Sequence, residues 1–214
     1  MKKIILASIL PLSLAACSGD KPAETAEKKM DAPEKKEMAA KPAMNMEEVL
    51  ASKTEAAKGA MKALGGSLKK ELQTVMTAGG PVEAIHVCNT KANSITMQVM
   101  QEKGMDLGRV SLRNRSPENA ADGWKKAILE DFEARKAAGE APDKLVYREI
   151  VDADGGKEFR MMKAIPTAKL CLTCHGTSIA PEVASKIDEI YPDDKAKGFN
   201  EGDLRGAFWV TSKL

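Results

Sequence analysis

The stretch KLVYREIVDADGGKEFRMMKAI (144–165) has the pattern of a β-hairpin. Two runs with β-branched, aromatic and other apolar residues, 144–151 and 157–165, flank the segment DADGG (152–156). Acidic residues followed by two glycines are typical of the tight turns that join antiparallel strands. A third strand is predicted at 204–212, which contains the run AFWV. The C-terminal half of the chain is therefore expected to contain an antiparallel sheet.

Two long helices are predicted before this hairpin. Apolar residues in 57–75 and 82–99 recur every three or four positions, which indicates one inward stripe on each helix. The GGP segment (79–81) is expected to end the first helix and start the second, and Gly104 to end the second. The stripes consist of Ala57, Met61, Leu64, Leu68, Leu72 and Val75, and of Val82, Ile85, Cys88, Ala92, Ile95 and Val99.

Shorter elements complete the expected domain. Residues 109–112 are predicted to be extended, and the Ser-Pro pair at 116–117 to open a third helix. Residues 181–190 are predicted to form a short helix. Helices followed by antiparallel strands indicate an α+β domain over 46–214, with the long N-terminal helices packed against the sheet. The third helix is expected to present Trp124, Ile128 and Phe132 on one face.

The N-terminus has the features of a bacterial export signal. Two lysines precede the apolar stretch 4–14, which is too short to span a bilayer. The sequence LAAC (14–17) resembles a lipobox, so residues 1–16 are predicted to be a lipoprotein signal peptide and Cys17 the lipidated first residue. The alternative is an ordinary signal peptide that ends near a cysteine. By resemblance to lipoprotein sorting rules, Ser18 favours anchoring in the outer membrane, facing the periplasm.

Residues 17–45 are predicted to be a disordered tether. They consist largely of Ala, Lys, Glu, Pro and Met and contain no aromatic residue, so they cannot bury enough apolar surface to fold. The formal charge of the whole chain is only +2, and no basic block stands out. Nucleic acid is therefore not an expected partner, whereas a membrane, reached through the lipid anchor, is.

The motif CLTCH (171–175) is typical of covalent attachment of c-type haem. Both thiols add to the porphyrin vinyl groups, and His175 then serves as an axial ligand of the iron. Two alternatives remain. Zinc would need four ligands, with Cys88 added to Cys171, Cys174 and His175, but adjacent Cys174 and His175 are poorly placed on one tetrahedral ion. A redox dithiol would need a βαβ context, which the sequence lacks.

A second axial ligand would have to come from upstream, because no His, Met or Cys follows residue 176. The upstream candidates are His86, Cys88 and several methionines, and helix geometry separates the first two. At about 100° per residue, they point roughly 160° apart on a helix. Cys88 shares the apolar stripe, so it is predicted to face the core and to ligate the iron. The alternative is an inert buried cysteine.

Four stretches resemble one known family: AIHVCNTKA (84–92), RVSLRNRSPENAADGW (109–124), CLTCHG (171–176) and YPDDKAKGFNEGDLRGAFWV (191–210). The chain resembles the bacterial c-type haem domain with a PAS-like fold, formerly catalogued as a domain of unknown function. The resemblance implies an α+β, PAS-like antiparallel sheet and His/Cys axial ligation. The ligands fall on His175 and Cys88. Ser116 and Lys125 depart from the family pattern.

The expected function follows from this ligand set. A thiolate ligand favours ferric iron and a low potential, so the protein is expected to be a redox or gas sensor or a low-potential cytochrome, with a possible redox partner protein. The alternatives are a haem enzyme of peroxidase type and a structural lipoprotein with a vestigial haem. Haem propionates are expected to pair with Arg113 and Arg115, because arginine forks match carboxylates. Further candidates for this pairing are Arg109, Lys195 and Arg205.

Overall fold

The computed structural model describes residues 45–214. The predicted signal peptide, Cys17 and nearly all of the predicted tether lie outside the described residues. Within them, no helix combines the length and the apolar character that crossing a membrane requires. The elements are α1 Met46–Lys103, β1 Asp106–Val110, η1 Pro117–Asn119, α2 Gly123–Ala137, η2 Pro142–Lys144, β2 Val146–Ala153, β3 Gly156–Pro166, η3 Lys169–Cys171, α3 Leu172–His175, α4 Pro181–Ile190 and β4 Leu204–Lys213.

The strands form a single antiparallel sheet in the order β1-β4-β3-β2. Strands β2 and β3 pair from Val146 opposite Lys163 to Ala153 opposite Gly156, which confirms the predicted hairpin and its turn. Strand β4 lies between β3 and β1, so the C-terminal strand occupies the centre of the sheet. The predicted α+β class is confirmed.

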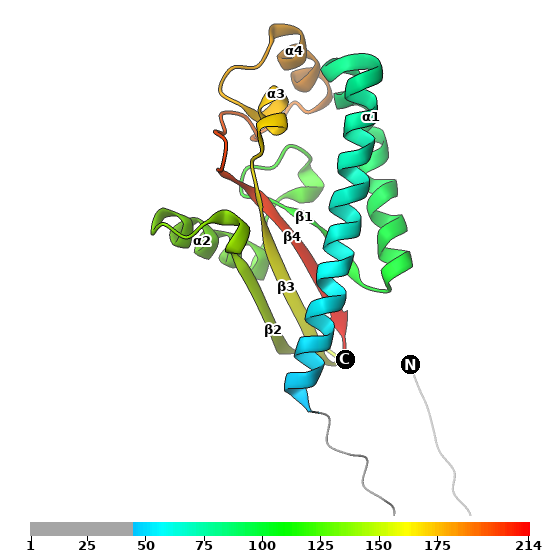
Figure 1. Cartoon of the computed structure of the whole chain (residues 1–214), viewed down its shortest axis with the longest axis vertical. Coiled ribbons are helices and arrows are strands. Elements are labelled where there is room, and N and C mark those ends of the chain that lie inside the picture. The colour runs from blue at the N-terminus through cyan, green and yellow to red at the C-terminus, as the bar shows by residue number, and fades with distance from the viewer. Residues whose placement is uncertain (1–44) are drawn as a thin grey trace, which may run out of the picture. The chain divides into compact units, whose positions relative to one another are not determined.

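Helix α1 is a helical hairpin (Figure 1). Gly80 has a φ of 74° and a ψ of −173°, a conformation that is essentially restricted to glycine, and the chain reverses direction there. Pro81 follows, where its missing N–H costs nothing at the start of the second arm. An ion pair between Lys91 and Glu71, 2.7 Å long, joins the two arms. The predicted break at GGP and the predicted end at Gly104, which adopts the left-handed conformation, are both confirmed.

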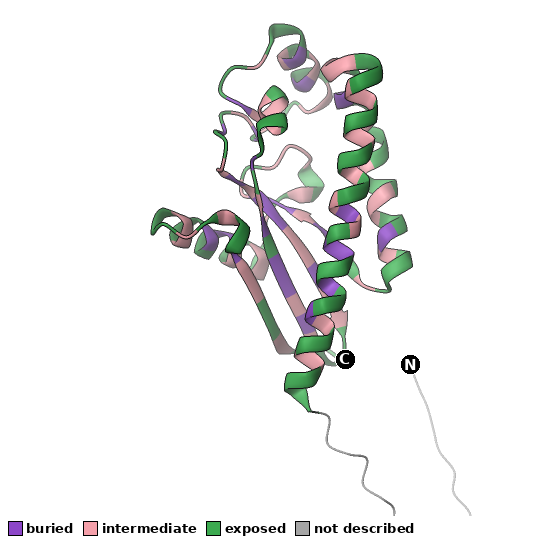
Figure 2. Ribbon diagram, viewed as in Figure 1, coloured by how far each residue is buried: buried purple, intermediate pink, exposed green. Residues whose placement is uncertain are grey.

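The two faces of the sheet carry separate hydrophobic cores, and Figure 2 shows buried positions concentrated along the strands. Both arms of α1 cover one face, where Leu64 and Val99 pack against Phe159 and Val210. Helix α2 covers the other face, with Phe132 at the centre of its contacts. A third cluster joins α4 to the turn end of α1 through Ile85, Val183 and Ile187.

The start of the third helix was predicted wrongly. The Ser-Pro pair opens only the short 3-10 turn η1, and the α-helix α2 begins at Gly123. The reason is a pairing outside the helix: Ser111 donates its N–H to the Asn119 carbonyl, and its own carbonyl accepts from Ala121. These bonds hold residues 119–121 extended beside the end of β1, so a helix cannot propagate through them.

Candidate functional site

The CLTCH motif occupies η3 and the single-turn helix α3, just beyond the end of β3. A loop at 194–199 binds the backbone of this motif. Phe199 donates its N–H to the His175 carbonyl, and Gly198 donates to the Gly176 carbonyl, each over 2.9 Å. Gly176 has no room for a side chain, because a Cβ would lie 2.6 Å from the Leu172 carbonyl oxygen. The motif is therefore held in place on several sides.

His175 has one ring nitrogen bound and the other available. Its Nδ1 lies 2.7 Å from the Ala196 carbonyl oxygen. A carbonyl only accepts, so Nδ1 carries the proton and Nε2 carries the lone pair. Burial, assisted by the positive charges of Arg205 and Arg115, lowers the pKa of His175 to about 2. The imidazole is therefore neutral and able to donate its Nε2 lone pair to a metal.

The prediction that Cys88 faces the protein core is wrong, because its side chain is exposed. The stripe on the second arm of α1 has buried ends: Ile85 packs with α4, and Val99 packs on the sheet. Cys88 and Ala92, between these ends, belong to none of the hydrophobic clusters in residues 45–214. The apolar stripe is thus covered by α4 at one end and by the sheet at the other, and is left uncovered between them at Cys88 and Ala92.

Cys88 nevertheless lies close enough to the candidate site to interact electrostatically with groups there. The charges of Arg109 and Arg115 act on its thiol, and its own charge acts on Cys174 and Tyr191. Burial nevertheless raises the pKa of the Cys88 thiol, while the two arginines lower it. His86, predicted to point elsewhere, is exposed, and it is not among the groups that shift the pKa of Cys88, Cys174 or Tyr191.

The two arginines expected to pair with propionates both have protein partners. Arg113 donates to the Lys197 carbonyl and stacks on Phe199, with its guanidinium carbon 4.0 Å from the ring centroid. Arg115 forms a 3.1 Å ion pair with Asp194. Their remaining N–H groups leave room for a further acceptor, and the Arg115 Nε is buried with no hydrogen-bond partner in the described part of the chain.

Two further arginines add positive charge to this region. Arg205 donates to the Ser111 hydroxyl and to the Arg113 carbonyl, and burial together with Arg115 and Arg109 lowers its pKa to about 10. Burial also lowers the pKa of Arg109, whose guanidinium has no hydrogen-bond partner among residues 45–214. Four arginines thus bring positive charge to this region, and among them only Arg115 is ion-paired with a carboxylate of the described residues, Asp194, so the region favours an anionic ligand.

The helical hairpin supplies an apolar surface beside these charges. Leu72 and Val75 on the first arm, like Ala92 on the second, are only partly buried and belong to none of the hydrophobic clusters. The site therefore combines thiols, a neutral imidazole, excess positive charge and uncovered apolar side chains. Within the described residues no three His, Cys, Asp or Glu side chains converge as metal ligands, so the four-ligand zinc set is not assembled.

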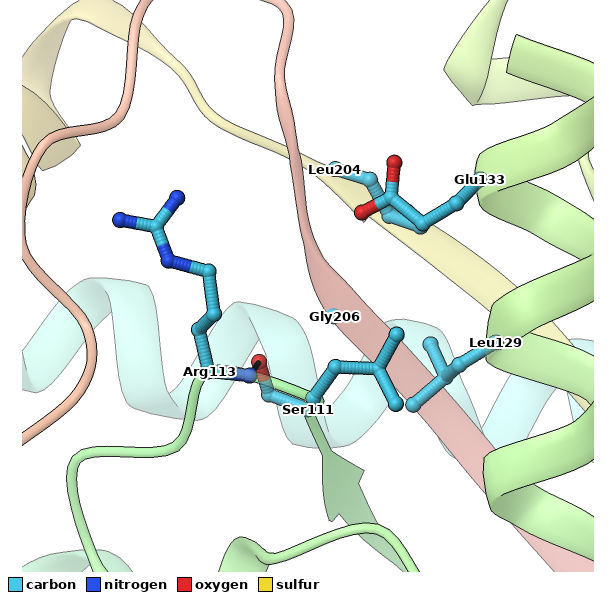
Figure 3. A pocket seen from close by; sticks show the side chains of 7 residues that line it. Ser111, Arg113, Leu129, Glu133, Leu204 and Gly206 are labelled. Carbon is cyan, nitrogen blue, oxygen red and sulfur yellow. Dashed lines mark hydrogen bonds between the residues drawn. The ribbon is translucent and has the colours of Figure 1, made fainter. Parts of the chain in front are cut away.

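A small enclosed pocket lies elsewhere, between the sheet and α2 (Figure 3). Its volume is about 10 Å³, enough for roughly one water molecule. A wide surface groove of about 590 Å³ lies at the other end of α1, beside Lys53, Met100 and Lys213. Neither contains a residue of the CLTCH motif. The small pocket is lined by Ser111, Leu112, Arg113, Leu129, Glu133, Leu204 and Gly206.

Comparison with known proteins identifies the family. A family model described as Tll0287-like matches residues 26–212. The chain belongs to the Tll0287-like family. A solved structure, described as that of the cyanobacterial heme-protein Tll0287, is 20% identical, with a TM-score of 0.52 over 82% of this chain and 98% of that chain. At that identity the match establishes a shared fold. A search of curated proteins gave no match.

Several residues of the site were not predicted from the sequence. Asp194, Ala196 and Phe199 hold the motif from the 194–199 loop, and Tyr191 lies near Cys88. All lie in the quoted stretch 191–210, but a carboxylate that will be buried looks like any surface carboxylate in a sequence.

Proposed function

We propose that the protein is an exported c-type haem protein that acts as a redox or gas sensor or as a low-potential electron-transfer cytochrome. One haem c would be attached through Cys171 and Cys174, with His175 and Cys88 as axial ligands. Membership of the Tll0287-like family and the description of the solved relative as a heme-protein support haem binding. The observation that carries the proposal is a neutral His175 with a free Nε2, close to Cys174 and facing the same arginines as Cys88.

The residues present fit such a group. A haem is a large apolar ring with two carboxylates, and it supplies an iron that changes between the ferric and ferrous states. Leu72, Val75 and Ala92 offer the ring an apolar wall that the protein leaves partly uncovered. The unpartnered Arg115 Nε and the guanidinium of Arg109 suit carboxylates. Arg113, Arg115 and Arg205 remain candidates for the same contact.

The ligand set supports a low potential. Burial raises the pKa of the Cys88 thiol against the opposing charges of Arg109 and Arg115, so its thiolate would form on binding iron. A thiolate is an anionic donor and stabilises the ferric state more than the ferrous state. If the thiolate leaves the iron readily upon reduction, the site would suit a sensor of redox state or of a small gas. In the electron-transfer role, the protein would instead exchange electrons with a redox partner protein.

The remaining features of the proposal concern the setting of this domain. We assign residues 46–214 to a haem-binding domain with a PAS-like fold, residues 1–16 to the signal peptide and 17–45 to a tether. Lipid on Cys17 would anchor the protein in a periplasm-facing membrane, the outer membrane being favoured by Ser18. Replacement of Cys17 by Ser should release the protein into the soluble fraction of fractionated cells, because stable attachment depends on the acyl chains.

Covalent attachment can be tested by changing both Cys171 and Cys174 to Ala. The variant should carry no haem after denaturing electrophoresis, measured by haem stain and by pyridine haemochrome absorbance. Cys88→Ala is the matched control and should keep its haem, because thioether bonds do not involve Cys88. Haem that remains with the denatured double variant would show that these thiols are not the attachment points.

Axial ligation can be tested by comparing Cys88→Ala with His86→Ala. The wild type should give a low-spin ferric electron paramagnetic resonance spectrum with thiolate character. Cys88→Ala should become high-spin and have a higher reduction potential, because an anionic donor is lost. His86→Ala should resemble the wild type, because positions 86 and 88 point roughly 160° apart on a helix. The reverse result would indicate a bis-histidine cytochrome.

A haem enzyme of peroxidase type is the second candidate. Its support is Arg109, an arginine close to Cys88 and without a protein partner in the described residues. Turnover of hydrogen peroxide with a phenolic reductant separates the two functions. The proposed sensor or cytochrome should be nearly inactive as wild type and should gain activity in Cys88→Ala, whereas an enzyme should already be active as wild type.

A further inference from the structure

Asp194 is the most deeply buried carboxylate near the CLTCH motif, with 1% of its side chain exposed. Its Oδ2 accepts a hydrogen bond from Arg115 Nη2 over 3.1 Å. Its Oδ1 accepts from the backbone N–H of Ala196 over 2.9 Å. The two oxygens thus join a guanidinium to a backbone amide of the 194–199 loop.

The same peptide segment continues to His175. The carbonyl of Ala196 accepts the hydrogen bond from His175 Nδ1, at 2.7 Å. Arg115 Nη2 also donates to the Cys174 carbonyl, at 2.5 Å, and lies 3.5 Å from the Ala196 carbonyl oxygen. A continuous set of hydrogen bonds therefore runs from Arg115 through Asp194 and Ala196 to the imidazole, and returns to the motif at Cys174.

Burial makes this connection stiff. The Arg115 side chain is 12% exposed and that of Asp194 is 1% exposed, so water cannot readily replace either partner. Removing one member of a buried charge pair leaves the other uncompensated, which is costly. Groups behind a metal-binding histidine set its tautomer and ring orientation and raise its basicity as a ligand.

We propose that Asp194 and Arg115 are positioning residues that fix the Ala196 carbonyl and thereby the tautomer, plane and donor strength of His175. The proposal rests on the proposed function in so far as His175 binds iron. It assigns Arg115 a role inside the protein, as the cation that holds Asp194, in addition to any contact with a propionate. The negative charge of Asp194, linked through Ala196 to His175, would stabilise the ferric state of an iron held by His175.

Two variants of Asp194 separate its hydrogen bond from its charge. Asp194→Asn keeps an oxygen that can accept from Ala196 but removes the charge, and Asp194→Ala removes both. The reduction potential should rise in both variants. The ferric electron paramagnetic resonance spectrum should stay a single species in Asp194→Asn and split into several low-spin species in Asp194→Ala, because the imidazole plane is no longer fixed. Both are measured on the full-length, haem-loaded protein.

Asp188→Asn is the matched control. Asp188 pairs with Lys197 in the same loop but is 65% exposed and has no bond to Ala196. It should match the wild type in potential and spectrum. Wild-type potential and spectrum in both haem-loaded Asp194 variants would overturn the proposal. Absence of covalent haem from the wild type, read separately by haemochrome absorbance, would instead refute the proposed function.

A measurement on the unaltered protein keeps the test independent of folding. The N–H of Ala196, bound to a buried carboxylate, should exchange with deuterium far more slowly than the N–H groups of Asp154 and Gly155 in the exposed turn between β2 and β3, as followed by NMR. Rapid exchange at Ala196 in the wild type would overturn the proposal even if no Asp194 variant could be purified.

Discussion

The two ends of the helical hairpin α1 have different surroundings. Near the chain's first described residues, Ala57 and Leu64 of the first arm and Val99 of the second are buried against the sheet. Near the hairpin turn, Leu72 of the first arm and Cys88 of the second lie on the same stripes but reach none of the hydrophobic clusters. The first end is buried against the sheet, whereas the turn end packs on α4 and Cys174 through Ile85 and leaves the rest of its stripes uncovered.

This difference shows what an apolar stripe can and cannot predict. The three-to-four periodicity continues unchanged through both ends, because the helix turns at the same rate throughout. The sheet, however, covers only part of the hairpin length. The stripe therefore identifies the inward side of each arm, but the neighbour on that side depends on the sheet and on the segments that extend beyond it.

The largest effect is expected from Leu64→Ala, at the covered end. Leu64 is fully buried, so the variant should lower the free energy of unfolding by about 2–5 kcal/mol through lost burial and an unfilled cavity. Leu72→Ala should lower it by less, because Leu72 is partly exposed. Urea denaturation followed by circular dichroism measures both. Leu72→Ala should instead alter the haem absorbance spectrum. Equal losses of stability in Leu64→Ala and Leu72→Ala would show that the two ends of the hairpin do not differ in this way.

Much of the fold could be predicted because the decisive signals are local. The DADGG turn set the β2–β3 hairpin, the GGP segment set the reversal in α1, and Pro181–Ile190 is a helix with the predicted bounds. Each depends on residues that are neighbours in the chain. The start of α2 was missed because the bonds between Ser111 and residues 119–121 join separate segments.

The candidate site was less predictable for the same reason. The CLTCH motif is a local pattern, so its chemistry could be proposed directly. The prediction that Cys88 faces the core required knowing where the sheet ends, which periodicity does not contain. Asp194 and Ala196 have no local signal, because their importance comes from Arg115 and His175, which are distant in the sequence.

A smaller effect is expected at the turn between the two arms. Gly80→Ala should lower the free energy of unfolding by about 1–3 kcal/mol, because a residue with a Cβ is strained at its φ and ψ. No atom lies within 4 Å of the added Cβ, so the cost is confined to the backbone. Gly66→Ala, inside the first arm and equally free of contacts, should raise the free energy of unfolding by about 0.5–1 kcal/mol. The same sign for both variants in urea denaturation would contradict this account.

At the uncovered end, Arg109→Met should lower the reduction potential. Arg109 is a partly buried positive charge that acts on Cys88, and such a charge favours the ferrous state, which carries one positive charge less. Removing this charge should change the free energy of reduction of the iron by on the order of 1 kcal/mol. Potentiometric titration measures the shift, and Arg148→Met, on the exposed edge of β2, is the control that should leave the potential unchanged. An unchanged potential in Arg109→Met would place this charge away from the iron.

The smallest effect concerns Asp203, where the site loop joins the sheet. Its side chain accepts from the Asn200 N–H over 2.7 Å and from Lys136 of α2 over 3.1 Å. Its backbone carbonyl accepts from Thr167, at the point where β3 leaves the sheet toward the CLTCH motif. Asp203 therefore connects the two regions that the comparison separates.

Acid should weaken this connection in a defined direction. The hydrogen bond from Asn200, with help from Lys136, lowers the pKa of Asp203. A carboxyl whose pKa is lower in the folded than in the unfolded state adds stability above the unfolded pKa and loses it as the pH falls through the folded pKa. Asp203→Asn should thus cost about 0.5–1 kcal/mol at pH 7, and its difference from the wild type should shrink below roughly pH 4. Urea denaturation of both proteins at pH 7 and pH 3 measures the change. A difference that is the same at both pH values would show that Asp203 acts through its shape and not through its charge, and that the junction between the two regions does not respond to acid.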